Sequence, residues 1–199
     1  MKIQRRFFFI LVLLLLCSGC AHNIKINPKL DNIGNEGPSQ KINKNVGYYI
    51  STENIALQTT TSAGGGDSVK YAPYADLEPA FNLVLSNIFT TTYMIKDLND
   101  ISFLQDKDIS FVFIPRITTT SSSRNAFFWP PTDFSMTINC IAVDKDQTQV
   151  WQTTVQADND VVAVSEIIKD HSLAGKLAAE NALKKLQKEL IDAAVFRNK

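Results

Sequence analysis

The segment Ile109-Ser110-Phe111-Val112-Phe113-Ile114 is the most apolar run of the chain after its first twenty residues. Aromatic and β-branched residues favour a strand, and a continuous apolar run predicts one that is covered on both faces. Pro115 follows directly and cannot donate a backbone hydrogen bond. Pairing should therefore be interrupted at Pro115, or one side of the strand should be left open there. The run predicts an inner strand around which the rest of a sheet is arranged.

A second strand and its hairpin partner are predicted downstream. Apolar residues occupy every second position, with Ser135, Thr137 and Asn139 between them: Phe134, Met136, Ile138, Cys140 and Ala142. This alternation places one face of the strand on a core and leaves the other more polar. Residues 144–148 form a polar turn, and residues 150–155 return as the second arm of a hairpin. Cys140 falls on the buried face, where a lone thiol is protected.

Two amphipathic helices complete the predicted fold. The first shows one apolar face at spacings of three and four, with Asp76 as its N-cap: Leu77, Phe81, Val84, Leu85, Ile88 and Phe89. The second, over about 172–191, has small residues near its start that should let it lie close on a sheet: Gly175, Ala179, Ala182, Leu183, Leu186 and Leu190. Asp170 or Ser172 is expected to cap it.

Strand-forming segments at 46–50 and 55–61 precede a glycine-rich loop at 64–66. A phosphate-binding loop would need Lys-Ser or Lys-Thr at the start of a helix, whereas residues 67–71 look like another strand. We therefore expect a mobile turn between two strands. Together these elements predict an α+β fold: a mixed, largely antiparallel sheet with two helices packed on one face.

The N-terminus has the organisation of a signal peptide. Basic residues precede an apolar run at 7–16, and a small-residue site ends at Cys20. Ten apolar residues are too few for a membrane-spanning helix, which needs about 20. We therefore predict that residues 1–19 are a removable signal and that Cys20 is the first residue of the mature protein.

The segment Ser18-Gly19-Cys20 resembles the lipobox of bacterial lipoproteins. The resemblance implies that Cys20 carries acyl chains such as palmitate. Cys17 stands where leucine is usual, and it is the poorer candidate for lipidation because Leu16 would then occupy a position that must be small. An ordinary secretory signal is the alternative. Ala21 is not the aspartate that marks inner-membrane retention in enteric bacteria, so we expect a lipid anchor in the outer membrane, with the protein facing the periplasm.

Residues 20–45 are rich in polar residues, Gly and Pro, with scattered Ile and no sustained period. We interpret them as a lipidated flexible tether, although a short strand at 23–26 remains an alternative. Residues 46–199 would then form a single periplasmic domain. The chain has 20 basic and 20 acidic residues, and loss of Lys2, Arg5 and Arg6 leaves 17 basic residues, a net charge of −3. This balance does not favour nucleic acid as a partner.

The residues of the mature chain offer little for catalysis. His22 falls in the predicted tether and His171 at a helix start, so no clustered metal ligands are expected. The sequence has no nucleophile elbow and no spare histidine, so a serine hydrolase is not indicated. Two carboxylate pairs lie in polar turns and are expected to be solvated: Asp106 with Asp108, and Asp158 with Asp160. We therefore predict a protein that is not an enzyme and has no metal and no cofactor.

One loop calls for a functional interpretation. After the polar residues 118–125, three aromatic residues precede two prolines, a pattern that fits neither a helix nor a central strand. The candidate partner contacts are Phe127, Phe128, Trp129 and Phe134. If exposed, these rings would form an aromatic contact surface. The alternative is a loop that folds back and plugs the open end of the sheet. The contact surface and the plug are compatible if only one ring is buried.

The order of a lipobox, a polar tether, strands, a helix, a hairpin and a C-terminal Ala/Leu/Lys helix resembles small Gram-negative lipoproteins of the YajG type. The segment Trp129-Pro130-Pro131-Thr132-Asp133-Phe134 resembles an uncharacterised group of proteobacterial lipoproteins over about 71–190. The resemblance implies a role in envelope assembly or maintenance. We predict a non-catalytic accessory that binds or positions another component of the cell envelope. The alternatives are a subunit of an outer-membrane secretion or transport machine and, less favoured, an envelope hydrolase. A membrane and an envelope protein are the expected partners.

Overall fold

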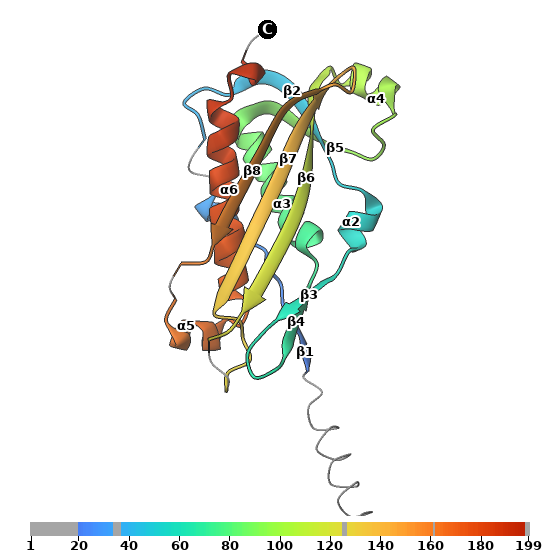
Figure 1. The fold of residues 1–199 in the computed structure, drawn as a ribbon. Helices are drawn as coiled ribbons and strands as arrows, with labels where there is room; N and C mark the ends of the chain where they lie inside the picture. Colours follow the sequence, from blue (N-terminus) through green and yellow to red (C-terminus); the bar gives the residue numbers. More distant parts are fainter. Residues whose placement is uncertain (1–19, 34–36, 125–126, 161, 198–199) are drawn as a thin grey trace, which may run out of the picture.

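The computed structural model describes residues 20–33, 37–124, 127–160 and 162–197. Its larger sheet has five strands in the order β5-β2-β6-β7-β8 (Figure 1). Their bounds are Phe89–Ile95, Ile42–Tyr49, Ile109–Ser122, Asp133–Asp144 and Gln149–Asp158. Strand β2 is parallel to β5 and β6, and the β6-β7-β8 meander is antiparallel. The predicted α+β fold with a mixed sheet is confirmed.

Strand β6 is the inner strand that its apolar run predicts. It pairs with β2 as far as Phe113 on one side and with β7 from Phe111 to Ser122 on the other. Pro115 lies just beyond the end of the β2 ladder, so its missing N–H interrupts no pairing there. Residues 118–122, which the sequence marks only as polar, also belong to this strand. Their backbone pairs with β7, and Thr119 and Ser121 bond to residues of a second sheet.

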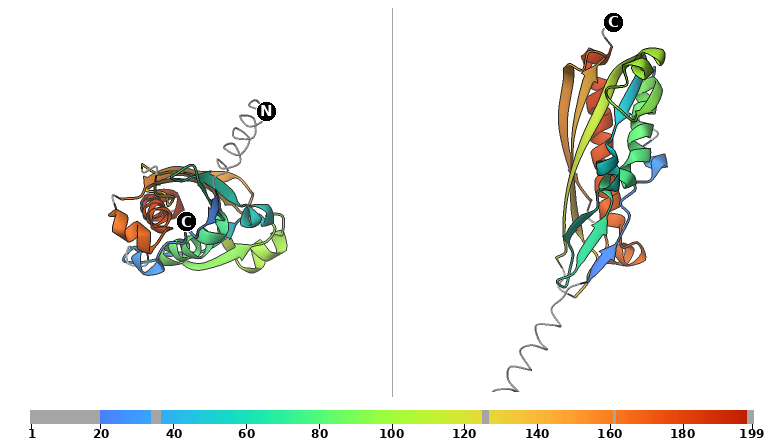
Figure 2. Two further views of the ribbon diagram at one scale, coloured as in Figure 1. Left: turned by 90° about the horizontal axis from the view of Figure 1, so that it is seen from below. Right: turned by 90° about the vertical axis from the view of Figure 1, so that its right-hand side faces the viewer.

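Two long helices pack on one face of the five-stranded sheet, as predicted (Figure 2). Helix α3 spans Pro73–Ile88 and α6 spans Leu173–Asp192. Helix α6 contacts the sheet through fully buried small residues and leucines: Ala174, Ala178, Ala179, Ala182, Leu183, Leu186 and Leu190. Helix α3 begins four residues earlier than its apolar period indicates, because Pro73 fits the first turn. Asp76 is therefore inside the helix and is not its N-cap, and no side chain caps α6.

A smaller apolar cluster covers part of the opposite face. Helix α4, Ile101–Asp106, contributes Leu104, which lies with Ile95, Ile109 and Val112. Lower on the same face, polar side chains of β6, β7 and β8 are exposed or half-buried: Thr118, Thr120, Thr137, Asn139, Thr154 and Gln156. We call these six residues the open face.

The N-terminal segment is not the tether that its composition suggests. Strand β1, Ala21–Asn23, pairs in parallel with β4, Ser68–Tyr71, which also pairs with β3, Thr59–Ser62. Ile24, Ile26 and Ile33 are buried in the main core. Ile26 donates its N–H to Asp76 and lies against Gly175 of α6, where a Cβ would come within 2.4 Å of its Cγ2. Residues 20–33 therefore belong to the folded domain, and β2 already begins at Ile42.

Several short elements complete the chain. Part of the strand expected at 55–61 is instead helix α2, Thr52–Ala56, whose N-cap Ser51 accepts from the Asn54 N–H. Helix α5 spans Val164–Lys169, and single 3₁₀ turns span Leu30–Asn32 and Ala194–Phe196. At the edge strand β8, α6 donates two side-chain hydrogen bonds: Lys185 Nζ to the Gln156 carbonyl and Asn181 Nδ2 to the Asp158 carbonyl, at 2.7 and 3.1 Å.

Candidate functional site

Cys20 is bonded directly to the small sheet. Its N–H donates to Asp67 Oδ1 at 2.8 Å, and its carbonyl accepts from the Ser68 N–H at 3.0 Å. The Ile24 N–H continues the ladder by donating to the Lys70 carbonyl at 3.0 Å. The Cys20 side chain itself is exposed. The predicted lipidation residue therefore adjoins the folded domain with no flexible segment between them.

The glycine turn that precedes Asp67 places its carboxylate where it can accept the hydrogen bond from the Cys20 N–H. Gly65 and Gly66 have φ values of 66° and 84°, a region that glycine adopts without strain, so the chain reverses tightly between β3 and β4. The predicted turn between two strands is thus confirmed. The second carboxylate oxygen of Asp67 lies 2.8 Å from His22 Nε2, which must be the donor because a carboxylate only accepts. The hydrogen bonds from His22 and from the Cys20 N–H lower the pKa of Asp67.

Trp129 joins the predicted aromatic loop to this pair. Its ring stacks on His22, with centroids 3.8 Å apart and 14° between the planes. It also makes an edge contact with His171, at 4.7 Å and 71°. The Trp129 carbonyl accepts from the Gly64 N–H at 2.9 Å. Three segments that are distant in the sequence therefore meet at one ring: the start of β1, the β6–β7 loop and the turn between α5 and α6.

The four candidate contact residues have different environments. Phe134 is 2% exposed and packs on Tyr71, so its assignment as a contact is wrong: it starts β7 with its side chain in the core. Trp129 is half-buried and plugs the lower end of the molecule, whereas Phe127 is 99% exposed and Phe128 is intermediate. Trp129 therefore packs within the domain, and a contact role for Phe127 and Phe128 stays a prediction.

The sequence does not reveal Asp67 as the partner of Cys20, or His22 as a second partner of Asp67. The composition around His22 indicates a tether, and Asp67 stands where the glycine-rich turn gives way to a predicted strand. A weak signal was present: His22, Ile24 and Ile26 stand at alternate positions, which is the period of a strand. Asp67 could not have been found in this way, because it reaches Cys20 only through the β1–β4 pairing.

The remaining ionisable groups behave as surface or core residues. Among the described residues, no group of His, Cys, Asp and Glu could hold a metal ion. The carboxylate pairs expected to be solvated are exposed: Asp106 with Asp108, and Asp158 with Asp160. Cys140 is fully buried, and burial raises the pKa of its thiol, which keeps it protonated and unreactive.

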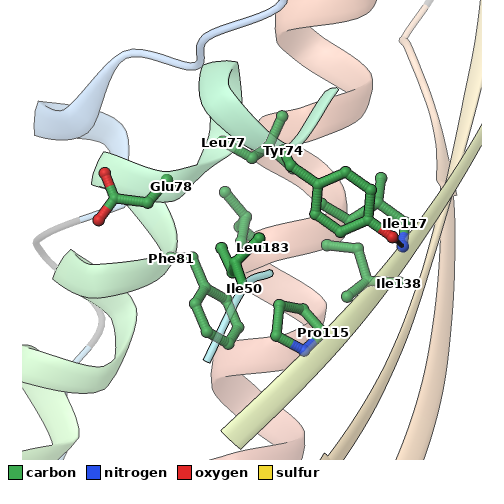
Figure 3. Close-up of a pocket in the computed structure, with 9 residues that line it drawn as sticks. All are labelled: Ile50, Tyr74, Leu77, Glu78, Phe81, Pro115, Ile117, Ile138 and Leu183. Atoms are coloured by element: carbon green, nitrogen blue, oxygen red, sulfur yellow. Dashed lines mark hydrogen bonds between the residues drawn. The ribbon is translucent and has the colours of Figure 1, made fainter. Parts of the chain in front are cut away.

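A small cavity lies between α3, α6 and the sheet (Figure 3). Its volume is about 10 Å³, which is room for about one water molecule. Tyr74, Phe81, Pro115 and Ile138 converge on it, whereas the carboxylate of Glu78 points away. Glu78 accepts a hydrogen bond from Tyr48 Oη. Burial, reinforced by the bond and the charge of Glu78, raises the pKa of Tyr48. The cavity is too small to bind a metabolite.

Comparison with known proteins does not identify a family. No family model matches the chain, and no curated protein matches it in sequence. Among solved structures, a PelC dodecamer from Paraburkholderia phytofirmans is 12% identical, with a TM-score of 0.40, over 76% of this chain and 92% of PelC. A leucine-to-methionine variant of PelC from the same organism is 11% identical, with a TM-score of 0.36, over 74% and 94%. Within the described residues, no helix has the length and apolar character needed to cross a membrane.

Proposed function

We propose that this protein is a non-catalytic accessory of the cell envelope, anchored in the outer membrane by lipid on Cys20 and facing the periplasm. The lipobox-like sequence and the geometry around Cys20 support the proposal together. The single observation that carries it is the hydrogen bond from the Cys20 N–H to Asp67, beside an exposed thiol. Cleavage before Cys20 would leave an amine there, or an amide after acylation, and both can still donate to this carboxylate.

Direct attachment distinguishes this anchor from a tethered one. A flexible coil of about 25 residues would let the domain move over ~25–30 Å. Here β1 begins at Ala21, so acyl chains on Cys20 would hold the domain in a nearly fixed orientation relative to the membrane. A domain held in this way is suited to positioning a partner at a defined height above the bilayer.

The open face is the surface that we assign to that partner. It presents hydroxyl and amide groups from three neighbouring strands on a rigid meander. One cross-strand pair is already bonded, with Asn139 Nδ2 donating to Thr154 Oγ1 at 2.7 Å. Because Trp129 and Phe134 are occupied within the domain, the aromatic loop is the poorer site for a protein partner.

Lipidation is tested by replacing Cys20→Ser in the full chain expressed with its own signal. We expect an unprocessed precursor without acyl chains, identified by the mass of its N-terminal peptide. Cys17→Ser is the matched control and should be processed and lipidated as the parent protein is. Normal processing and membrane fractionation of the Cys20→Ser variant would disprove the anchor.

Partner binding is tested by photocrosslinking in intact cells. A photoreactive residue at Thr118 samples the open face, and one at Lys145 in the exposed β7–β8 turn is the control. We expect one dominant envelope protein to be captured at Thr118 and not at Lys145. Loss of this protein's abundance when the captured partner is deleted would identify a subunit of a larger machine. The absence of any adduct from a folded, lipidated protein would contradict a partner on the open face.

A further inference from the structure

Three exposed apolar residues belong to α5 and the β6–β7 loop, which lie at the end of the molecule where the chain enters β1 (Figure 1). Phe127 is 99% exposed in the β6–β7 loop. Val164 and Ile168 are 48% and 55% exposed on α5, and their spacing of four places them on one side of that helix. The other large apolar side chains that are exposed in the described part of the chain are on separate elements: Leu30, Leu57, Met94 and Ile101.

The contacts of Trp129 hold this end together. Trp129 stacks on His22, two residues after Cys20, and touches His171, two residues after the end of α5. Two residues span at most about 7 Å of chain, so Phe127 and Cys20 are each within that reach of the stacked pair. Figure 1 and the right-hand view of Figure 2 agree that β1, α5 and the β6–β7 loop occupy the same end.

Because no flexible segment separates Cys20 from β1, lipid on Cys20 would turn this end of the molecule toward the membrane. Cys20 is hydrogen-bonded to Asp67 and Ser68, and β1 follows at once, so acyl chains on its sulfur would enter the bilayer at the end of the molecule that carries α5 and the β6–β7 loop. Exposed aromatic and aliphatic side chains are suited to the boundary between headgroups and acyl chains. A protein partner would have to share this space with the membrane surface.

We propose that Phe127, Val164 and Ile168 form a bilayer-contacting surface that seats the anchored domain on the membrane. The inference rests on the proposed lipidation of Cys20, and it adds a second, non-covalent contact with the same bilayer. In this arrangement Trp129 acts as a positioning residue. It fixes the loop that carries Phe127 against the strand that carries the anchor.

The test uses the full chain in intact cells, with a photoreactive residue at Phe127, at Ile168 or at Ile101. Ile101 is the matched control, because it is also apolar and 42% exposed but lies on α4 at the other end of the molecule. We expect phospholipid adducts, detected by mass spectrometry, at Phe127 and Ile168, and at least tenfold fewer at Ile101. Equal lipid labelling at all three positions, or a protein as the dominant adduct at Phe127, would overturn the proposal.

The N-terminal peptide from the same samples reports separately on the anchor. If Cys20 is acylated and Phe127 captures no lipid, the bilayer contact is wrong and the proposed anchor stands. If Cys20 has no acyl chain and Phe127 still captures lipid, the contact is supported and the anchor is wrong. If neither is observed, both proposals fail.

Discussion

Replacing Gly175→Ala tests whether the N-terminal segment is packed on α6 or free in solution. The new Cβ would lie 2.4 Å from Ile26 Cγ2. Ordinary carbon contacts are about 3.5–4.0 Å, so one of the two groups must move by about 1 Å. Ile26 is β-branched and fully buried, and it has little freedom to turn away.

The expected magnitude is a balance of two terms. Overpacking in a core costs about 1–3 kcal/mol of folding free energy. Alanine in place of glycine recovers about 1 kcal/mol of helix propensity. We therefore expect Gly175→Ala to lower the free energy of unfolding by up to about 2 kcal/mol. In an Ile26→Ala background, which itself costs about 2–5 kcal/mol, the obstruction is gone and Gly175→Ala should become neutral or stabilising.

A double-mutant cycle measures this change of sign. Urea unfolding of the four proteins, followed by circular dichroism, gives the coupling energy between positions 175 and 26, which we expect to be about 1–3 kcal/mol. A second cycle with Lys25→Ala, at an exposed neighbouring position, should show additivity. If Gly175→Ala has the same effect with and without Ile26, to within about 0.5 kcal/mol, the segment does not lie against α6 and a flexible tether would be restored.

Four further substitutions test other parts of the structure. Leu183→Asp places an unpaired charge at a fully buried position of α6 and should cost about 4 kcal/mol or more in chemical unfolding, so an unchanged midpoint would contradict the packing of this helix. Trp129→Ala removes two ring contacts and should lower stability by about 2 kcal/mol, whereas Phe127→Ala should change the thermal midpoint little, and a reversed order would contradict the plug. Although partial burial acts in the opposite direction, hydrogen bonds from Lys176 and Ser172 lower the pKa of Asp170. Asp170 therefore stabilises the fold at pH values above its unfolded-state pKa of about 3.9, and this stabilisation is lost as the pH falls through its lower folded-state pKa. Lys176→Gln removes one of the two donors, so stability should depend less on pH in the acid range.

The elements with strong local periodicity were predictable from the sequence. Helices α3 and α6 and the β7–β8 hairpin repeat apolar residues at spacings that only one secondary structure satisfies. Pro115 also had the predicted consequence, because the absence of an N–H is a property of the residue and not of its surroundings.

The elements stabilised by distant contacts were not predictable in this way. Ile24, Ile26 and Ile33 look isolated in the sequence but are buried in the core, and Ile26 is met there by Gly175 of α6 and by Asp76. The polar run at 118–122 forms a strand because β7 pairs with its backbone. The sequence marks Trp129 as unusual, but its partners His22 and His171 are far from it in the chain and come together with it only in the folded protein.

The two hydrogen bonds from α6 to β8 have a consequence for self-association. The last strand of an open sheet is normally a template on which a second chain can add by backbone pairing, which is a route to aggregation. Gln156 and Asp158 are two residues apart, so their carbonyls point the same way, toward the position that an added strand would occupy. Lys185 and Asn181 already bond to these carbonyls, and Lys185 adds a positive charge beside them. An incoming strand would have to displace both side chains, so the meander ends at β8 and its growth into an intermolecular sheet is blocked on this side.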